Sequence, residues 1–258
     1  MCYAADSAPI IKEKERALCS VNCILWLVRC MKHTNTEKVK RLSVAAMFTG
    51  LAFLVTVVFH IKVANFLTFE LKDAVMTIGG MICGPVYALG MSLAAALLEF
   101  LTISTTGLYG LVMNFISSLF FTLPACLIYK YNRTMKGAAI GIVTSIFSMT
   151  AVMMVANLLI TPLYYGMHVS KVVEMLPTLL LPFNLTKATL NAGMVLLLYK
   201  PVTGTLRKAK LLAPADTTQI GVRKRTVWTV VIALLMIAVS LLVFFLMLGG
   251  KISIGIDK

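Results

Sequence analysis

The chain has 258 residues, of which 59% are hydrophobic and only 13% are charged, and its formal net charge is +14. A soluble domain carries about 25% charged residues, so this composition argues against a soluble protein and favours an integral membrane protein. The basic residues stand in short clusters between apolar runs, which is typical of cytoplasmic loops and not of a nucleic-acid-binding surface.

Residues 1–37 differ from the rest of the chain, and we interpret them as an N-terminal extension on the cytoplasmic side. Their apolar stretch ALCSVNCILWLVRC is too short to span a bilayer, and no small-residue cleavage site follows it. Cys19 and Cys23 stand four apart, but no second ligand pair follows, so the signal for a metal site is weak and we expect no metal.

Residues 38–201 contain a succession of apolar segments, which predicts an all-α integral membrane domain of six transmembrane helices. The segments are residues 42–59, 74–83, 85–103, 108–129, 137–163 and 176–199. Five of them approach the length of about 20 residues that crosses a bilayer as a helix. The second is shorter, so it must be tilted, covered by its neighbours or extended at its flanks.

A further apolar run at residues 227–248 predicts an additional transmembrane helix with a short tail, together residues 227–258. A basic linker, residues 202–226, separates it from the six helices, and we interpret it as an appended anchor outside the core. Lys and Arg clusters before the first helix, between the fourth and fifth, and after the sixth fall on one side when six helices alternate. The positive-inside rule makes this side the cytoplasm and places the N-terminus there, in a multi-pass protein of the cell membrane.

Polar residues then collect in the outer third of the bundle. Asn184 and Lys187 lie one turn apart on one face of the sixth helix, while Asn157 and Asn114 lie near the outer ends of the fifth and fourth. An ionisable side chain in a span costs at least about 2.5 kcal/mol, so it should face a cavity or a partner. No polar path continues inward, which predicts a pocket that is open outside and closed below.

Several of these residues have a second interpretation. Lys187 could snorkel to the membrane surface, Asn157 could bond a neighbouring helix, and Glu99, near the outer end of the third helix, could pair with a basic group. Pro182 frees a backbone carbonyl one turn back and is expected to open the sixth helix locally. The segment FLTFEL, residues 66–71, alternates apolar and polar residues and predicts extended backbone beside the pocket.

Motifs for catalysis or nucleotide hydrolysis do not occur in the sequence. The GGK at residues 249–251 is followed by Ile252, and Phe245 stands where the first glycine of a phosphate-binding loop would be. No HExxH or GxSxG motif is present either. We therefore expect no enzymatic activity of the chain itself.

Four stretches, FELKDAVMTIGGMICGPVYALGMSLAAALLEF, STTGLYGLVMNFISS, MVANLLITPLYYG and LPFNLTKATLNAGMVLLLY, carry a family resemblance. Over residues 38–201 the chain resembles the substrate-binding S components of energy-coupling factor (ECF) vitamin transporters, and most of all their riboflavin-binding branch, RibU. The resemblance implies a membrane subunit that captures riboflavin, as substrate and not cofactor, from outside. Its partners would be a transmembrane coupling subunit and two ABC ATPase subunits.

The resemblance also implies functional residues. With the polar residues singled out above, the candidate ligand-binding set is Asn114, Asn157, Asn184, Lys187, Phe66, Leu67, Thr68, Phe69 and Glu70. Small residues on the first helix would pack on the coupling subunit, namely Ala45, Ala46, Thr49 and Gly50. Packing within the bundle is the alternative for these four. The N-terminal extension and the seventh apolar run depart from the family pattern.

Three other functions remain open at this point. The chain could be an S component for another vitamin or small molecule, or a membrane assembly protein whose polar cluster only joins helices. A secondary transporter would need a coupling-ion site, and the inner halves of the helices offer no acidic group for one.

Overall fold

The computed structural model describes residues 38–59, 61–64, 67–104, 106–132, 134–166, 168–208 and 222–248. The chain divides into two compact units, Met1–Ser43 and Val44–Lys258. The predicted extension with its cysteine pair, and Phe66 of the candidate site, lie outside the described residues.

Five helices in the described part of the chain are long and apolar enough to cross a membrane. They are the helix Lys38–Val58, α3 (Pro85–Thr102), α4 (Gly107–Tyr131), α5 (Met135–Tyr165) and α8 (Val222–Leu248). Helix α7 (Leu181–Lys208) has the length, but Asn184, Lys187 and Asn191 make it too polar to meet this criterion. The prediction of six spanning helices plus one is therefore met only in part.

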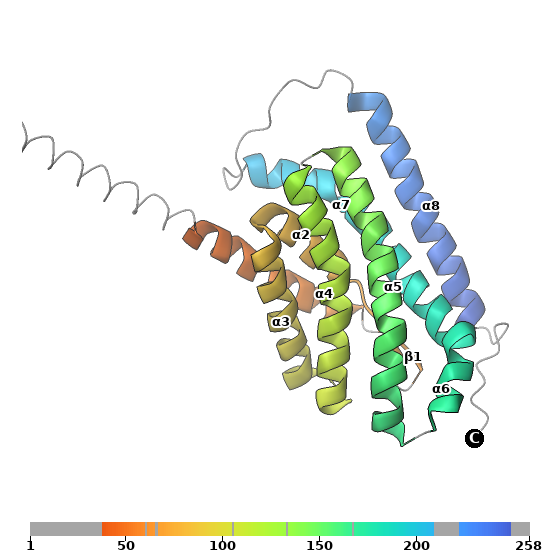
Figure 1. Cartoon of the computed structure of the whole chain (residues 1–258). Coiled ribbons are helices and arrows are strands. Elements are labelled where there is room, and N and C mark those ends of the chain that lie inside the picture. The colour runs from red at the N-terminus through yellow and green to blue at the C-terminus, as the bar shows by residue number, and fades with distance from the viewer. Residues whose placement is uncertain are drawn as a thin grey trace, which may run out of the picture. The chain divides into compact units, whose positions relative to one another are not determined.

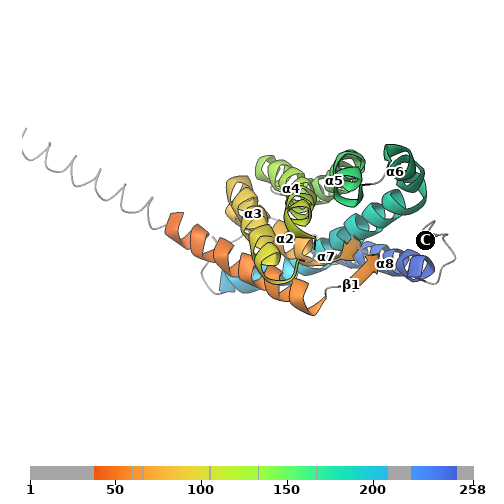
Figure 2. The same cartoon turned by 90° about the horizontal axis from the view of Figure 1, so that it is seen from below.

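The short second segment, α2 (Lys72–Cys83), lies among the other helices of its unit, and Figure 2 shows it between α3, α4 and α7. Every residue of α2 except Ile82 is buried. The sequence left three explanations for its shortness, and the structure shows that neighbouring helices cover it. The flank also extends the segment, as a second of these explanations had it, because α2 begins at Lys72, two residues before the apolar run.

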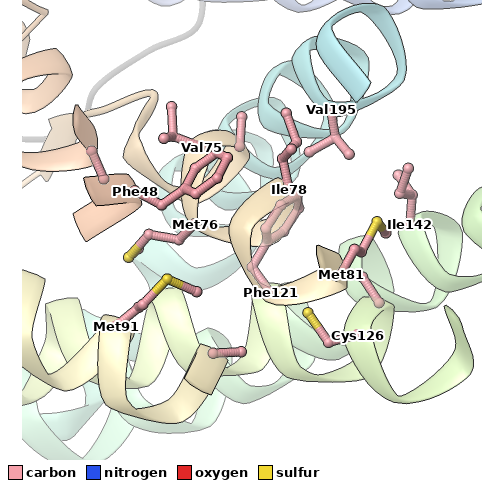
Figure 3. Close-up of a cluster of buried hydrophobic side chains, with 14 of the residues drawn as sticks. Phe48, Val75, Met76, Ile78, Met81, Met91, Phe121, Cys126, Ile142 and Val195 are labelled. Atoms are coloured by element: carbon pink, nitrogen blue, oxygen red, sulfur yellow. The ribbon is translucent and has the colours of Figure 1, made fainter. Parts of the chain in front are cut away.

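Two adjacent glycines let other helices approach α2 closely. A Cβ at Gly79 would lie 2.8 Å from Cγ of Phe48, and one at Gly80 would lie 2.6 Å from Sγ of Cys126. Figure 3 shows the apolar cluster around this crossing, with Phe48, Met76, Phe121 and Cys126 gathered about α2. Gly84 follows with a φ of 112°, which glycine adopts readily, and Pro85 then starts α3.

The segment between the first helix and α2 forms a β-hairpin, which confirms the predicted extended backbone. Strands β1 (Ile61–Ala64) and β2 (Leu67–Phe69) are antiparallel, with Ile61 opposite Phe69. Figure 1 shows the hairpin in the half of the bundle that also holds the α3–α4 and α5–α6 connections.

The predicted sixth helix, residues 176–199, corresponds to a π-helical turn and the first part of a long α-helix, and a short helix precedes them. Helix α6 (Val169–Met175) runs into a π-helical turn, η1 (Leu176–Leu180), and α7 follows directly. Pro182 has no N–H to donate to the carbonyl of Thr178, so the expected local opening of the helix falls where η1 lies.

Helix α8 was predicted to be an anchor appended to the six-helix core, and the structure shows it in contact with that core. It packs against α7, and its residues Ala233 and Phe244 are buried, with Phe244 in an apolar cluster that also contains Phe69 and Phe183. The predicted linker 202–226 is also too long. Helix α7 continues to Lys208 and α8 begins at Val222, while residues 209–221 lie outside the described part of the chain.

Candidate functional site

A cavity of about 100 Å³ lies among β2, α3, α4, α5 and α7. Its lining combines hydroxyl, amide, charged and aromatic side chains with a few apolar ones. The lining residues are Thr56, Leu67, Thr68, Glu70, Glu99, Ile103, Ser104, Thr106, Tyr109, Gly110, Met113, Asn114, Ser117, Met153, Asn157, Ile160, Thr161, Tyr164, Tyr165, Phe183, Asn184 and Lys187.

Two acidic and two basic side chains form a buried cluster at this cavity. The ammonium of Lys72 lies 2.8 Å from Oε2 of Glu70 and also bonds Oε2 of Glu99. The ammonium of Lys187 lies 3.6 Å from the same Oε2 of Glu70. Each of the four side chains is at most 5% exposed, so the low dielectric of the surroundings makes their pairing obligatory.

Hydroxyl and amide groups complete the coordination of the two carboxylates. Asn114 donates from Nδ2 to Oε2 of Glu99 at 2.9 Å, and the hydroxyl of Thr56 donates to Oε1 at 3.3 Å. The hydroxyl of Thr68 donates to Oε1 of Glu70 at 3.0 Å. The cluster thereby joins the hairpin, the first helix, α3 and α4.

Glu70 is the carboxylate of the cluster that faces both ammonium groups, those of Lys72 and Lys187. Burial raises the pKa of its carboxyl, but the ammonium groups of Lys72 and Lys187 outweigh burial and bring the pKa to about 2. Glu70 is therefore ionised at physiological pH, and it leaves Lys187 with a counter-ion on one side and the cavity on the other.

Asn191, one turn beyond Lys187 on α7, fixes the backbone around the cluster. Its Nδ2 donates to the carbonyls of Glu70 and Lys187, each at 3.0 Å, and its Oδ1 accepts from the amide of Ala74 at 3.0 Å. One side chain thus ties the start of α2 and the end of the hairpin to α7.

Asn157 and Asn184 reach the cavity from facing helices, α5 and α7. Each uses Nδ2 to donate to a carbonyl one turn back, Asn157 to Met153 at 2.7 Å and Asn184 to Leu180 at 2.8 Å. Oδ1 of Asn157 also accepts from Thr161 at 3.2 Å. An amide has two donor hydrogens and two acceptor lone pairs, so both side chains retain capacity for a ligand.

Three tyrosines lie on the wall of the cavity. The rings of Tyr109 on α4 and Tyr164 on α5 have centroids 5.6 Å apart, and those of Tyr164 and Tyr165 are 4.6 Å apart, all in edge-to-face arrangement. Such rings offer apolar, polarisable faces to a flat ligand.

The structure brings most of the predicted site residues together. Of the nine candidates, seven line the cavity: Leu67, Thr68, Glu70, Asn114, Asn157, Asn184 and Lys187. Phe69 points elsewhere, into the apolar cluster with Phe183 and Phe244. The snorkelling alternative for Lys187 is wrong, since the residue is 4% exposed and paired with Glu70. The pairing expected of Glu99 is confirmed, with Lys72 as its partner.

Of the four small residues predicted to contact a partner on the first helix, two are buried and two are exposed. Ala45 and Thr49 are buried within the bundle, and Thr49 donates its hydroxyl to the carbonyl of Ala45 at 2.9 Å. Ala46 and Gly50 are exposed, and a Cβ at Gly50 would meet open space. Only the latter pair is available to a partner, because successive helical residues point in different directions.

Sequence reasoning missed several residues of the site. Lys72 was not among the candidate site residues, yet it is 1% exposed and binds two carboxylates. Asn191 and the three tyrosines were not singled out. A signal existed for Asn191, which follows Lys187 at helical spacing in the same apolar stretch.

Comparisons with known proteins agree with this arrangement. A family model described as "ECF transporter, substrate-specific component" matches residues 40–203. The chain is 27% identical over 182 residues to the riboflavin transporter RibU of Staphylococcus aureus (strain TCH60), which covers 67% of this chain and 96% of that protein. It is 29% identical over 132 residues to the riboflavin transporter FmnP of Bacillus subtilis (strain 168), covering 49% and 70%.

A solved structure gives a similar result. It is described as "Structure and mechanism of the S component of a bacterial ECF transporter", and it superposes with a TM-score of 0.56 at 29% identity. The match covers 65% of this chain and 98% of the solved chain.

Proposed function

Because this chain belongs to the family of substrate-specific components of ECF transporters, we propose that it is the riboflavin-binding subunit of such an importer. The family is one of transport and not of catalysis, and the apolar helices make the chain a multi-pass membrane protein. Two relatives, RibU of Staphylococcus aureus and FmnP of Bacillus subtilis, are riboflavin transporters, which supports this choice of substrate.

The observation that carries the proposal is the pairing of tyrosine rings with polar groups in one cavity. Riboflavin has a flat isoalloxazine body with an edge of carbonyls and an imide N–H. Lys187 donates to a carbonyl of that edge, and Asn157 and Asn184 each donate and accept there. The faces of Tyr109 and Tyr164 cover the apolar part of the ring.

The vitamin enters from the extracellular side in this proposal. The cavity lies in the half of the bundle that holds the α3–α4 connection, and the Lys and Arg clusters of the sequence fall at the opposite ends of the helices. The N-terminus is then cytoplasmic.

Import depends on partners that supply the energy. The chain docks through the exposed small residues Ala46 and Gly50 on a transmembrane coupling subunit, and two ABC ATPase subunits hydrolyse ATP. Small residues suit this role because they let two helices approach closely in lipid.

Titration of the purified, ligand-free protein with riboflavin tests the proposal. Riboflavin fluorescence should be quenched at micromolar or lower concentrations, and the bound vitamin should raise the melting temperature. Thermal shifts with a panel of other vitamins serve as controls. Stabilisation by a different vitamin alone identifies an S component of another specificity, whereas no response to any small molecule favours a membrane assembly protein.

A further inference from the structure

We propose that Phe244 of α8 is a positioning residue that holds strand β2 against the cavity and slows release of the ligand. The inference rests on the proposed function, since it gives α8 a part in riboflavin binding. Helix α8 lies beyond residues 40–203, which are the part of the chain that the family model matches.

Helix α8 docks on α7 along a single face. Ala233, Ile237, Ser240 and Phe244 are spaced four, three and four residues apart, which places them in one stripe of a helix. Ala233, Ser240 and Phe244 are buried, and Ile237 packs on the same apolar cluster as Phe244.

Gly193 of α7 allows this close approach. A Cβ at Gly193 would lie 2.8 Å from Cγ1 of Ile237 and 3.1 Å from the backbone oxygen of Ala233. Helix α8 can therefore approach α7 this closely only where Ala233 and Ile237 lie opposite Gly193. This alignment fixes the position of Phe244 at the far end of α8.

Phe244 reaches the hairpin from this contact. Its ring centroid lies 4.8 Å from that of Phe69 on β2, and Phe69 in turn lies 6.3 Å from Phe183 in edge-to-face contact. Phe69 and Phe244 are 4% and 5% exposed, so each is covered by the other and by the apolar cluster.

Neighbouring residues of this segment have different roles as a consequence. Phe69 anchors the strand in the apolar cluster, Thr68 and Glu70 line the cavity, and Leu67 contributes to both. Glu70 is also the counter-ion of Lys187. Any loosening of Phe69 thus shifts a cavity wall and the partner of a ligand-binding ammonium together.

A short two-stranded hairpin is marginally stable without packing against other elements. In the described part of the chain, Phe244 of α8 supplies this packing together with Phe183 of α7 and the apolar residues of α6 and η1 in the same cluster. The contact of Phe244 with Phe69 accordingly stabilises the hairpin in its ligand-binding position.

The test compares Phe244→Ala with Phe245→Ala in the full-length protein. Phe245 is the adjacent aromatic residue, is 65% exposed and has its ring 6.0 Å from that of Phe244, so its loss leaves the Phe244–Phe69 pair in place. Hydrogen–deuterium exchange of peptides covering β1 and β2 is measured on ligand-free protein, and the dissociation rate is measured after riboflavin loading.

Phe244→Ala should raise exchange in the hairpin and accelerate dissociation roughly tenfold, as expected for loss of one buried aromatic pair. Phe245→Ala should change neither. Gly193→Ala should act in the same direction as Phe244→Ala, because it pushes α8 away from α7 without touching the hairpin. Phe244→Leu, which keeps most of the apolar volume, should give a smaller effect and serves if Phe244→Ala does not fold.

If hydrogen–deuterium exchange of the hairpin is unchanged in Phe244→Ala, the inference is overturned. A lower melting temperature of this variant with unchanged hairpin exchange would mean that Phe244 has a purely structural role. An equal effect of Phe245→Ala overturns it as well. Should no form of the chain bind riboflavin, the proposed function fails, and the exchange measurement on ligand-free protein alone decides whether Phe244 positions β2.

Discussion

The ammonium of Lys187 lies 3.6 Å from the carboxylate of Glu70, and both side chains border the same cavity. Glu70 has a second and closer ammonium in Lys72, at 2.8 Å. Lys187 is therefore the one of the two lysines that can turn toward a ligand without leaving Glu70 unpaired.

Replacing Lys187 by Met should weaken riboflavin binding about tenfold to a hundredfold, because a charged donor to a ligand carbonyl is lost, at about 1.4 kcal/mol per tenfold. The fold should persist, since Lys72 still neutralises Glu70. Fluorescence titration and a melting curve measure the two effects. Lys171→Met, at an exposed lysine of α6, is the control and should leave affinity unchanged. Wild-type affinity in Lys187→Met would show that the lysine is only a counter-ion.

Replacing Lys72 by Met should act on stability more than on affinity. Glu70 and Glu99 would lose the ammonium that both of them bind, and breaking a buried ion pair costs about 3–5 kcal/mol in free energy of unfolding. Adding Glu99→Gln should recover part of the loss by removing one of the uncompensated charges. Chemical unfolding in detergent measures both variants. A double variant no more stable than Lys72→Met would contradict the assignment of this cluster as a mutually dependent unit.

The amides of Asn157 and Asn184 should each contribute to affinity. Asn157→Leu and Asn184→Leu remove a polar partner from the cavity, which is expected to cost about 1–3 kcal/mol of binding free energy. The hydrogen bonds that they lose in the ligand-free protein run to backbone carbonyls of their own helices. Thr144→Val on the exposed side of α5 is the control. Equal affinities in all these variants would mean that the ligand sits elsewhere.

The exposed small residues of the first helix should matter for transport alone. Ala46→Leu and Gly50→Leu should reduce riboflavin uptake in vesicles that contain the partner subunits, while binding by the isolated protein stays unchanged, since both positions face away from the bundle. Gly90→Leu is a matched control, because Gly90 on α3 is also exposed with open space at its Cβ position. Parallel losses of binding and transport would contradict a docking role.

Gly79 and Gly80 should tolerate no larger side chain. Alanine at either position places a Cβ within 2.8 Å of Cγ of Phe48 or within 2.6 Å of Sγ of Cys126. Overpacking of this kind typically costs about 1–3 kcal/mol, whereas Gly90→Ala, in open space within a helix, should stabilise by up to about 1 kcal/mol. Melting temperatures of the three variants check this, and a neutral Gly79→Ala would mean that the crossing at α2 is looser than it appears in the structure.

The sequence by itself determined the class of the protein, the order of its helices and most of the cavity residues. Apolar runs and turn residues are local signals, and Asn184 with Lys187 stood out because polar groups are expensive in a stretch that is otherwise apolar. The extended segment before α2 was equally readable, since alternation along a strand is local as well.

Only the tertiary structure decided which polar residues pair and which faces are covered. The sequence does not show that Lys72 bonds Glu99, which is 27 positions away, or that Asn191 holds the carbonyl of Glu70, 121 positions away. The burial of α2 on nearly every side and the contact of Phe244 with Phe69 depend likewise on how helices cross. Ion pairing and helix packing are long-range interactions, and neighbouring residues in the chain carry no signal of them.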